Sequence, residues 1–137
     1  MKYAIFLGCN IPARVAQYEK STRAVLGLLG VDILDIKDFA CCGYPVRNLD
    51  RMAFLLSAAH NMALAEKAEC DMLVLCKCGF GTFKEAQRQL STEPGMLDSV
   101  NTKLAFKGLR YSGSSRIKHL LSVLYHDVGV DELKNRV

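Results

Sequence analysis

The sequence lacks tryptophan, a long apolar stretch and a glycine-rich loop with phosphate-binding spacing. Its basic residues form no runs interleaved with aromatic residues, and the net charge of +4 is too small to indicate nucleic-acid binding. A membrane-spanning helix needs about 20 apolar residues, whereas the apolar start covers only Tyr3 to Leu7, with no cleavage-site pattern after it. No Ser–His–Asp arrangement can be identified. These absences argue against a nucleic-acid-binding protein, a membrane-spanning protein, a phosphate-loop enzyme and a serine hydrolase.

The length and composition predict one globular domain covering residues 1–137. The chain has a mass of 15.2 kDa, half of its residues are hydrophobic and 23% are charged, which is enough to bury a core without disulfides. No internal repeat or linker divides it. We expect a cytoplasmic protein, and in that compartment thiols stay reduced, so clustered cysteines indicate metal binding or catalysis before disulfide bonding.

Short apolar runs alternate with helical patterns along the chain. Strands are predicted at residues 2–7, 31–36 and 72–75, and helices at residues 13–29, 50–69, 82–90 and 117–125, with another beginning near Pro94. Residues 128–137 are expected to form a short helix or a tail. This alternation predicts the α/β class, with a parallel β-sheet flanked by helices.

Five of the six cysteines follow the three predicted strands. They are Cys9, the pair Cys41 and Cys42, and the pair Cys76 and Cys78, with 31 and 33 residues between successive groups. Because parallel strands end at one edge of a sheet, all five thiols are expected to meet at that edge, where such sheets bind ligands. The cysteine clusters are therefore placed at the C-terminal ends of the strands.

Converging thiols favour a metal–sulfur centre, since soft sulfur ligands suit iron–sulfur clusters and zinc. The side chains of adjacent residues such as Cys41 and Cys42 diverge in extended backbone. Unless the turn is unusual, they are better suited to different irons of one cluster than to one small ion. Cys70 precedes the third strand at the opposite edge and is expected to be structural.

Several segments resemble those of a known family. The pattern of one cysteine, then Cys41-Cys42-Gly43, then a close cysteine pair is similar to the CCG cysteine-rich domain. The resemblance extends over essentially the whole chain to the first, N-terminal half of the B subunit of heterodisulfide reductase. It rests on Leu7-Gly8-Cys9, Gly30-Val31-Asp32, Phe39-Ala40-Cys41-Cys42-Gly43, Leu75-Cys76, Phe80-Gly81-Thr82-Phe83-Lys84-Glu85-Ala86 and Val123-Leu124-Tyr125-His126-Asp127-Val128-Gly129.

This resemblance implies a multi-subunit oxidoreductase that reduces a disulfide at a noncubane [4Fe–4S] cluster. In methanogens the family's substrate is the coenzyme M–coenzyme B heterodisulfide, and related subunits act on other sulfur compounds. Electrons reach the B subunit from the iron–sulfur C subunit and ultimately from the flavoprotein A subunit. By position, the expected ligands are Cys9, Cys41, Cys42 and Cys76, with Cys78 as the fifth. No catalytic side chain is assigned.

The chain departs from the family pattern in two ways. The family ends its motif with Cys-x-x-Cys, whereas this chain has Cys76-Lys77-Cys78 with Gly79 at the last position. Family subunits also carry two such domains, so this one is expected to work with a second CCG domain or as a homodimer, unless the chain is a fragment.

Two other functions remain open on the sequence alone. The domain could be a non-catalytic zinc-binding or assembly module that uses four thiols as ligands, Cys9, Cys42, Cys76 and Cys78. It could also be a metal-free thiol–disulfide exchanger acting through one of its close cysteine pairs, although neither pair has the Cys-x-x-Cys spacing of a thioredoxin-like site.

Overall fold

A computed structural model describes residues 1–136 of the chain. It contains one sheet with four parallel strands in the order β2-β1-β3-β4, which confirms the predicted α/β class. The strands are β1 (Lys2–Phe6), β2 (Asp32–Asp35), β3 (Asp71–Val74) and β4 (Ile117–His119). The α-helices are α1 (Asn10–Arg14), α2 (Ala16–Leu28), α3 (Arg51–Lys67), α4 (Lys77–Thr92), α5 (Pro94–Leu104), α6 (Leu120–Ser122) and α7 (Val130–Arg136). Short 3₁₀ turns are η1 (Tyr44–Val46) and η2 (Ala105–Lys107), and η3 (Val123–Gly129) is a π-helix.

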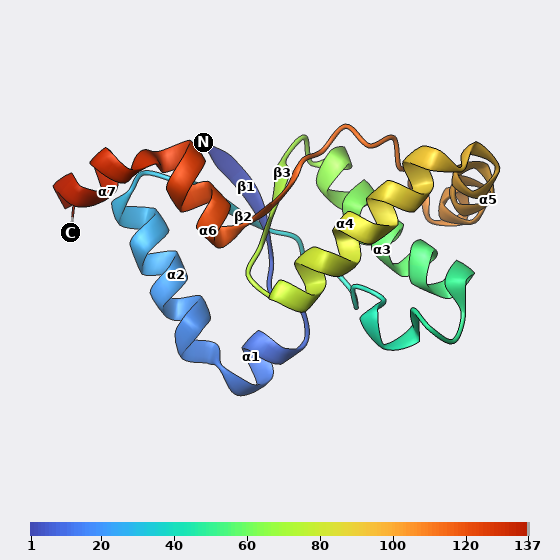
Figure 1. Cartoon of the computed structure of the whole chain (residues 1–137), viewed down its shortest axis with the longest axis horizontal. Coiled ribbons are helices and arrows are strands. Elements are labelled where there is room, and N and C mark those ends of the chain that lie inside the picture. The colour runs from blue at the N-terminus through green and yellow to red at the C-terminus, as the bar shows by residue number, and fades with distance from the viewer. Residues whose placement is uncertain (137) are drawn as a thin grey trace.

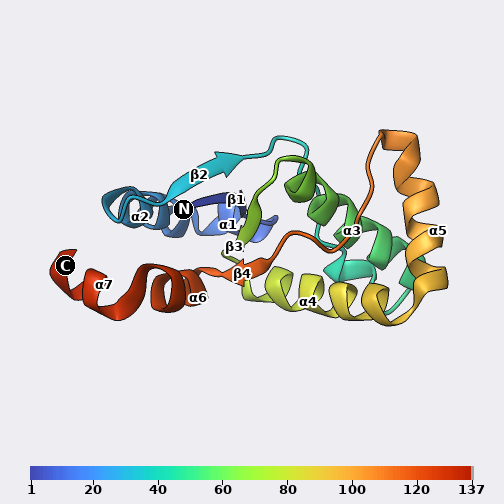
Figure 2. The same ribbon diagram turned by 90° about the horizontal axis from the view of Figure 1, so that it is seen from above.

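Helices cover both faces of the sheet, as Figures 1 and 2 show. α3, α4 and α5 lie on one face, while α1, α2, α6 and η3 lie on the other. The strand residues alternate accordingly: Ala4 and Phe6 of β1 face the first layer, and Tyr3 and Ile5 face the second. Strands buried on both faces explain why the sequence shows continuous apolar runs.

The layering follows from the order in which the strands join the sheet. The connection from β1 leads to β2 on one side, and the next connection returns past β1 to β3 on the other side. Right-handed crossovers that run in opposite directions place their helices on opposite faces. α1 and α2 therefore lie on one face and α3 on the other. After β1 and after β3 the chain leaves the sheet toward opposite layers, and in such sheets ligands bind outside the carboxyl ends of the strands.

α3 is the most deeply buried helix of the first layer. Its small residues let it approach the sheet closely, and Ala58 and Ala59 are completely buried. Asp50 caps its start by accepting a hydrogen bond from the Ala53 amide at 3.0 Å. The predicted helix at residues 50–69 is confirmed as α3. Because α3 is packed against the sheet, the loop after β2 can pack on it and hydrogen-bond to it.

Three predicted elements differ from the structure. The helix predicted at residues 117–125 is wrong at its start, because Ile117–His119 is β4 and pairs with β3; a three-residue strand is too short to show a period. The helix predicted at 13–29 is two helices, interrupted at Val15. α4 begins at Lys77 rather than near residue 82, so Cys78 lies in its first turn.

α7 matches the expected short C-terminal helix, while Val137 lies outside the described residues. Within residues 1–136, no helix is both long and apolar enough to span a membrane.

A part-buried ion pair joins η3 to the sheet. The Lys118 ammonium on β4 donates to both carboxylate oxygens of Asp127 at 2.7 Å, and the Tyr3 hydroxyl donates to the same carboxylate at 2.9 Å. Burial acts to raise the pKa of Asp127, but the hydrogen bonds from Lys118 and Tyr3 outweigh it and hold that pKa below its usual value. Burial, followed by the bond to Asp127, raises the pKa of Tyr3 to about 12. The pair fixes η3 over the sheet.

Replacing Asp127 with Asn should lower the free energy of unfolding by roughly 1–2 kcal/mol at pH 7, because Lys118 loses its charged partner. Since the folded pKa of Asp127 is depressed, this contribution is fully present above the ordinary aspartate pKa of about 3.9 and is lost as pH falls through the folded value. Urea denaturation of both proteins should therefore show a difference at pH 7 that shrinks below about pH 3.

Glu132→Gln is the matched control, because it breaks only an exposed pair with Arg136 and should cost less than about 0.5 kcal/mol. An equal loss in both variants, or an undiminished Asp127→Asn loss in acid, would contradict this account of η3.

Candidate metal–sulfur site

The cysteine loops leave β1, β2 and β3 at the same edge of the sheet. Cys9 comes three residues after the end of β1, Cys41 six residues after β2, and Cys76 two residues after β3. β1 and β3 are neighbours in the sheet, so Cys9 and Cys76 follow adjacent strands. The fold thus places the three cysteine groups at the edge expected from the sequence.

The loops after β1 and β3 lie close to each other at Cys76. A Cβ placed on Gly8 would lie 3.8 Å from the Cβ of Cys76, and one placed on Gly79 would lie at the same distance. Gly8 has a φ of +71°, a conformation that favours glycine. The backbone that presents Cys9 therefore passes Cys76 at a distance that a single added methyl group would bridge.

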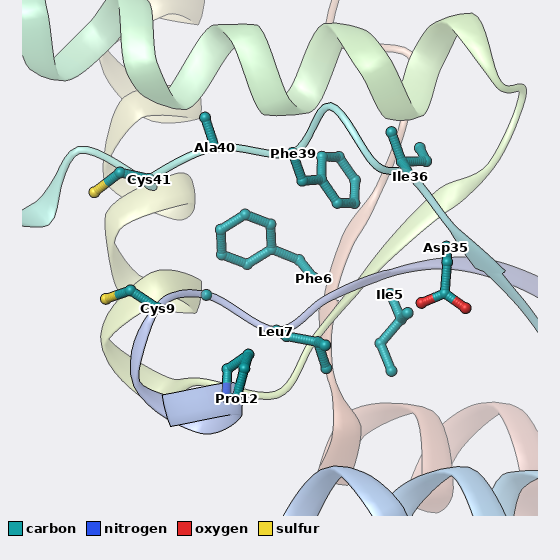
Figure 3. A pocket seen from close by; sticks show the side chains of 11 residues that line it. Ile5, Phe6, Leu7, Cys9, Pro12, Asp35, Ile36, Phe39, Ala40 and Cys41 are labelled. Carbon is teal, nitrogen blue, oxygen red and sulfur yellow. The ribbon is translucent and has the colours of Figure 1, made fainter. Parts of the chain in front are cut away.

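Cys9 and Cys41 share one hollow of about 360 Å³. Figure 3 shows their side chains at the same end of this hollow, with both sulfur atoms directed to the same side. Behind them lies the edge-to-face pair of Phe6 and Phe39, whose ring centroids are 5.4 Å apart. Both cysteines are exposed and free. The hollow thus joins thiols from two loops against an apolar wall.

Cys42 is half-buried against the core cluster of the first helix layer. Burial raises the pKa of the Cys42 thiol, hydrogen bonds with Tyr44 and Thr82 lower it, and negative charge on Cys41 or Cys76 raises it further. Two pairs of loops are thus close in space: Cys9 and Cys41 line one hollow, and Gly8, beside Cys9, lies close to Cys76.

Gly43 lets the cysteine loop lie against α3. It has a φ of +94°, and a Cβ there would lie 2.9 Å from the Phe54 carbonyl oxygen and 3.2 Å from the Ser57 Cβ. Its amide donates a 3.5 Å hydrogen bond to the sulfur of Cys41. Only glycine meets both the steric and the conformational requirement at this position.

Cys78 lies apart from the shared hollow. It lines a second hollow of about 710 Å³ together with three cationic residues, Arg47, Arg51 and Lys77. The Arg47 guanidinium stacks 3.9 Å from the Tyr44 ring centroid, and Arg51 is paired with Glu93. Cys78 is exposed in the first turn of α4, where unpaired backbone amides favour negative charge.

The donor set fits a metal–sulfur group in its chemistry. All five edge cysteines are free thiols, and they come from three loops that follow the carboxyl ends of parallel strands at one sheet edge. In the part of the chain that the structure describes, no three His, Cys, Asp or Glu side chains already form a compact group around one ion.

Cys70 and His119 make structural contacts away from the cysteine loops. Cys70 is buried at the opposite edge, and its thiol contacts the Ala68 carbonyl oxygen at 3.3 Å. His119 is a capping histidine that accepts a hydrogen bond from the Leu121 amide through Nδ1. One residue that carries no sequence signal does bear on the site: Asn61 of α3, which hydrogen-bonds to the cysteine loop.

Comparison with known proteins places these features in a family. The profile of the family "CCG: Cysteine-rich domain" matches residues 3–84. The chain is 34% identical to a heterodisulfide reductase B-subunit-like protein of Archaeoglobus profundus, over all of this chain and 46% of that protein. It is 32% identical to the B subunit of the ferredoxin:CoB-CoM heterodisulfide reductase of Methanosarcina mazei, over 99% of this chain and 46% of that protein.

Two further similarities extend the comparison. The 8-methylmenaquinol:fumarate reductase membrane anchor subunit of Wolinella succinogenes is 31% identical over 99% of this chain and 47% of that subunit. The crystal structure of a hypothetical protein from Helicobacter pylori aligns with a TM-score of 0.79 and 25% identity, over 87% of this chain and 24% of that one. The chain thus spans about half the length of the curated relatives it matches.

Gly43→Ala should distort the cysteine loop, because the added methyl group meets α3 backbone that cannot move aside. The positive φ alone costs roughly 1–2 kcal/mol, and the overlap with the Phe54 carbonyl should add at least about 1 kcal/mol. Gly30→Ala is the matched control, since Gly30 has a φ of +69° and open space around it. Chemical denaturation measures both losses, and equal losses would show that α3 does not constrain the loop.

Proposed function

Because the chain belongs to the CCG cysteine-rich domain family, we propose that it is the iron–sulfur domain of a heterodisulfide reductase-like complex that reduces a disulfide. The observation that carries the proposal is the placement of cysteines from three loops at one sheet edge. Similarity to the B subunit of heterodisulfide reductase along the whole chain supports it. The coenzyme M–coenzyme B heterodisulfide or a related sulfur compound is the proposed substrate.

The proposed ligands of a noncubane [4Fe–4S] cluster are Cys9, Cys41, Cys42 and Cys76, with Cys78 as a fifth. Such a cluster supplies the electrons that cleave a sulfur–sulfur bond. The chain supplies ligands and surroundings of two kinds. Cys42 and Cys76 are half-buried on the protein side, while Cys9, Cys41 and Cys78 are exposed. A disulfide substrate would therefore approach from the side of the exposed thiols.

The surroundings of the thiols favour negative charge. The first turn of α4 contains no acidic residue, and its free amides begin at Cys76. Lys77 and Arg47 lie beside Cys78, and no ion pair involves either of them in the part of the chain that the structure describes. Positive potential of this kind stabilises thiolates and a reduced centre.

The proposed partners follow from the relatives. The complex would supply the iron–sulfur C subunit and the flavoprotein A subunit as electron donors. Because the chain spans about half of each curated relative, a second CCG domain or a second copy of this chain would complete the substrate site. We propose a cytoplasmic location for this complex.

A second candidate function is a non-catalytic zinc-binding or assembly module. One relative of equal coverage carries the name of a membrane anchor subunit of a fumarate reductase. The names of similar proteins thus include a membrane anchor subunit as well as reductase subunits. The metal content of this chain distinguishes the two candidate functions.

The test is to purify the protein without oxygen, measure iron, acid-labile sulfide and zinc per chain, and record its EPR spectrum. Iron and sulfide in comparable amounts, with a redox-dependent signal, are expected. Cys42→Ser should lose most of the iron, whereas Cys70→Ser should retain it, because Cys70 lies at the opposite edge. One zinc per chain without sulfide would contradict the proposal and support the assembly module.

Cys78 needs a separate test, because it lines the second hollow, whereas a side chain at position 79 would lie beside Cys76. A Cβ on Gly79 would lie 3.5 Å from the Phe6 ring and 3.8 Å from the Cys76 Cβ, both ordinary contacts. If Cys78 is a ligand, Cys78→Ser should change the EPR signal, and the added Gly79→Cys substitution should restore it by supplying a thiol beside Cys76. An unchanged signal in Cys78→Ser would remove Cys78 from the ligand set.

A further inference from the structure

One buried amide side chain hydrogen-bonds to the backbone on either side of the Cys41 Cα. Asn61 of α3 is 0% exposed. Its Oδ1 accepts a hydrogen bond from the Ala40 amide at 2.8 Å, and its Nδ2 donates to the Cys41 carbonyl oxygen at 3.0 Å. Nδ2 also donates to the Ser57 carbonyl oxygen within α3 at 3.1 Å. A buried amide whose two ends are both satisfied fixes its partners in place.

The position of these bonds matters more than their number. The Cys41 carbonyl belongs to the peptide plane that joins Cys41 to Cys42. Because the side chains of adjacent residues diverge from such a plane, its orientation decides where both thiols point. In the observed orientation, Cys41 lines the hollow shared with Cys9, and Cys42 is half-buried against the core cluster of the first helix layer.

Two further contacts hold the same loop on α3. The Nε2 of His60 lies 3.1 Å from the Asp38 carbonyl oxygen, at the start of the loop. At its end, Gly43 lies against the backbone of Phe54. Asn61 acts between these points, and it is the contact that reaches the cysteines themselves.

We propose that Asn61 is a positioning residue for the metal–sulfur centre, one that sets the directions of the Cys41 and Cys42 thiols. Asn61 needs no contact with metal or substrate for this role. The inference rests on the proposed function only in taking both cysteines as ligands. The positioning itself is a property of the metal-free chain and can be measured there.

The chain contains a matched control for this arrangement. Asn101 of α5 makes the same pair of bonds to Tyr111: its Oδ1 accepts from the Tyr111 amide at 2.9 Å, and its Nδ2 donates to the Tyr111 carbonyl oxygen at 3.0 Å. This second loop carries no cysteine. Losing either asparagine should destabilise the fold, but only the loss of Asn61 should alter the thiols.

The first experiment measures alkylation rates of single cysteines by mass spectrometry in reduced, metal-free protein. The quantity compared is the rate at Cys42 divided by the rate at Cys9 in the same molecules, so that global unfolding affects both terms. Asn61→Leu keeps the number and branching of the side-chain heavy atoms and removes both bonds to the loop. It should raise the ratio about tenfold, because the loop opens without the rest of the fold. Asn101→Leu should leave the ratio within about twofold of the wild-type value.

An unchanged ratio in Asn61→Leu, or an equal rise in Asn101→Leu, would overturn the proposal. If Asn61→Leu does not fold, Asn61→Asp decides instead. That variant keeps an acceptor for the Ala40 amide and loses the donor to Cys41, so the ratio should still rise; an unchanged ratio would overturn the proposal as well.

The second readout is the midpoint potential and EPR line shape after anaerobic reconstitution with iron and sulfide. Asn61→Leu should differ from the wild type in both, and Asn101→Leu should match the wild type; identical spectra and potentials in all three proteins would overturn the positioning role. If the wild type takes up no iron and sulfide, the proposed function fails, and the alkylation ratio still decides whether Asn61 sets the thiol directions.

Discussion

In the four-strand parallel sheet, the chain leaves β1 toward one layer of helices and leaves β3 toward the other, and this reversal opens the edge where the cysteines gather. The loops after these neighbouring strands leave the sheet toward opposite layers, yet they remain close at Gly8 and Cys76. Cys9 and Cys76 lie near the ends of β1 and β3 because they follow those strands within three residues. The loop after β2 carries Cys41 and Cys42 past the same edge on its way to α3.

The cysteine loops are held to different degrees by the rest of the fold. The loop after β1 depends on the left-handed conformation of Gly8, which lies close to Cys76. The loop after β2 is longer and lies on α3, where Asn61 and Gly43 restrict it. Cys76 and Cys78 sit at the rigid start of α4. The thiols therefore come from three different segments: the loop after β1, the loop after β2 and the start of α4. Cys9, Cys41 and Cys78 are exposed, whereas Cys42 and Cys76 are half-buried.

The sequence predicts the three longer strands and the edge at which the cysteines meet, because apolar runs and cysteine spacing are local signals. It does not predict β4, since three residues carry no readable period and the next residues form helix. The start of α4 is not predicted because Cys76-Lys77-Cys78-Gly79 has the composition of a turn. In the structure Lys77, Cys78 and Gly79 form the first turn of α4, whose later residues Phe83 and Ala86 are buried in the core. The contacts of Asn61 are also absent from any local pattern, because they join residues 20 and 21 positions apart.

The most direct measurement of the central claim is anomalous X-ray diffraction at the iron absorption edge from crystals of the anaerobically prepared protein. The account predicts iron density bonded to sulfur from all three loops, with Cys9, Cys42 and Cys76 among the ligands. Iron held by the cysteines of one loop alone, or anomalous density at the zinc edge without any at the iron edge, would contradict it.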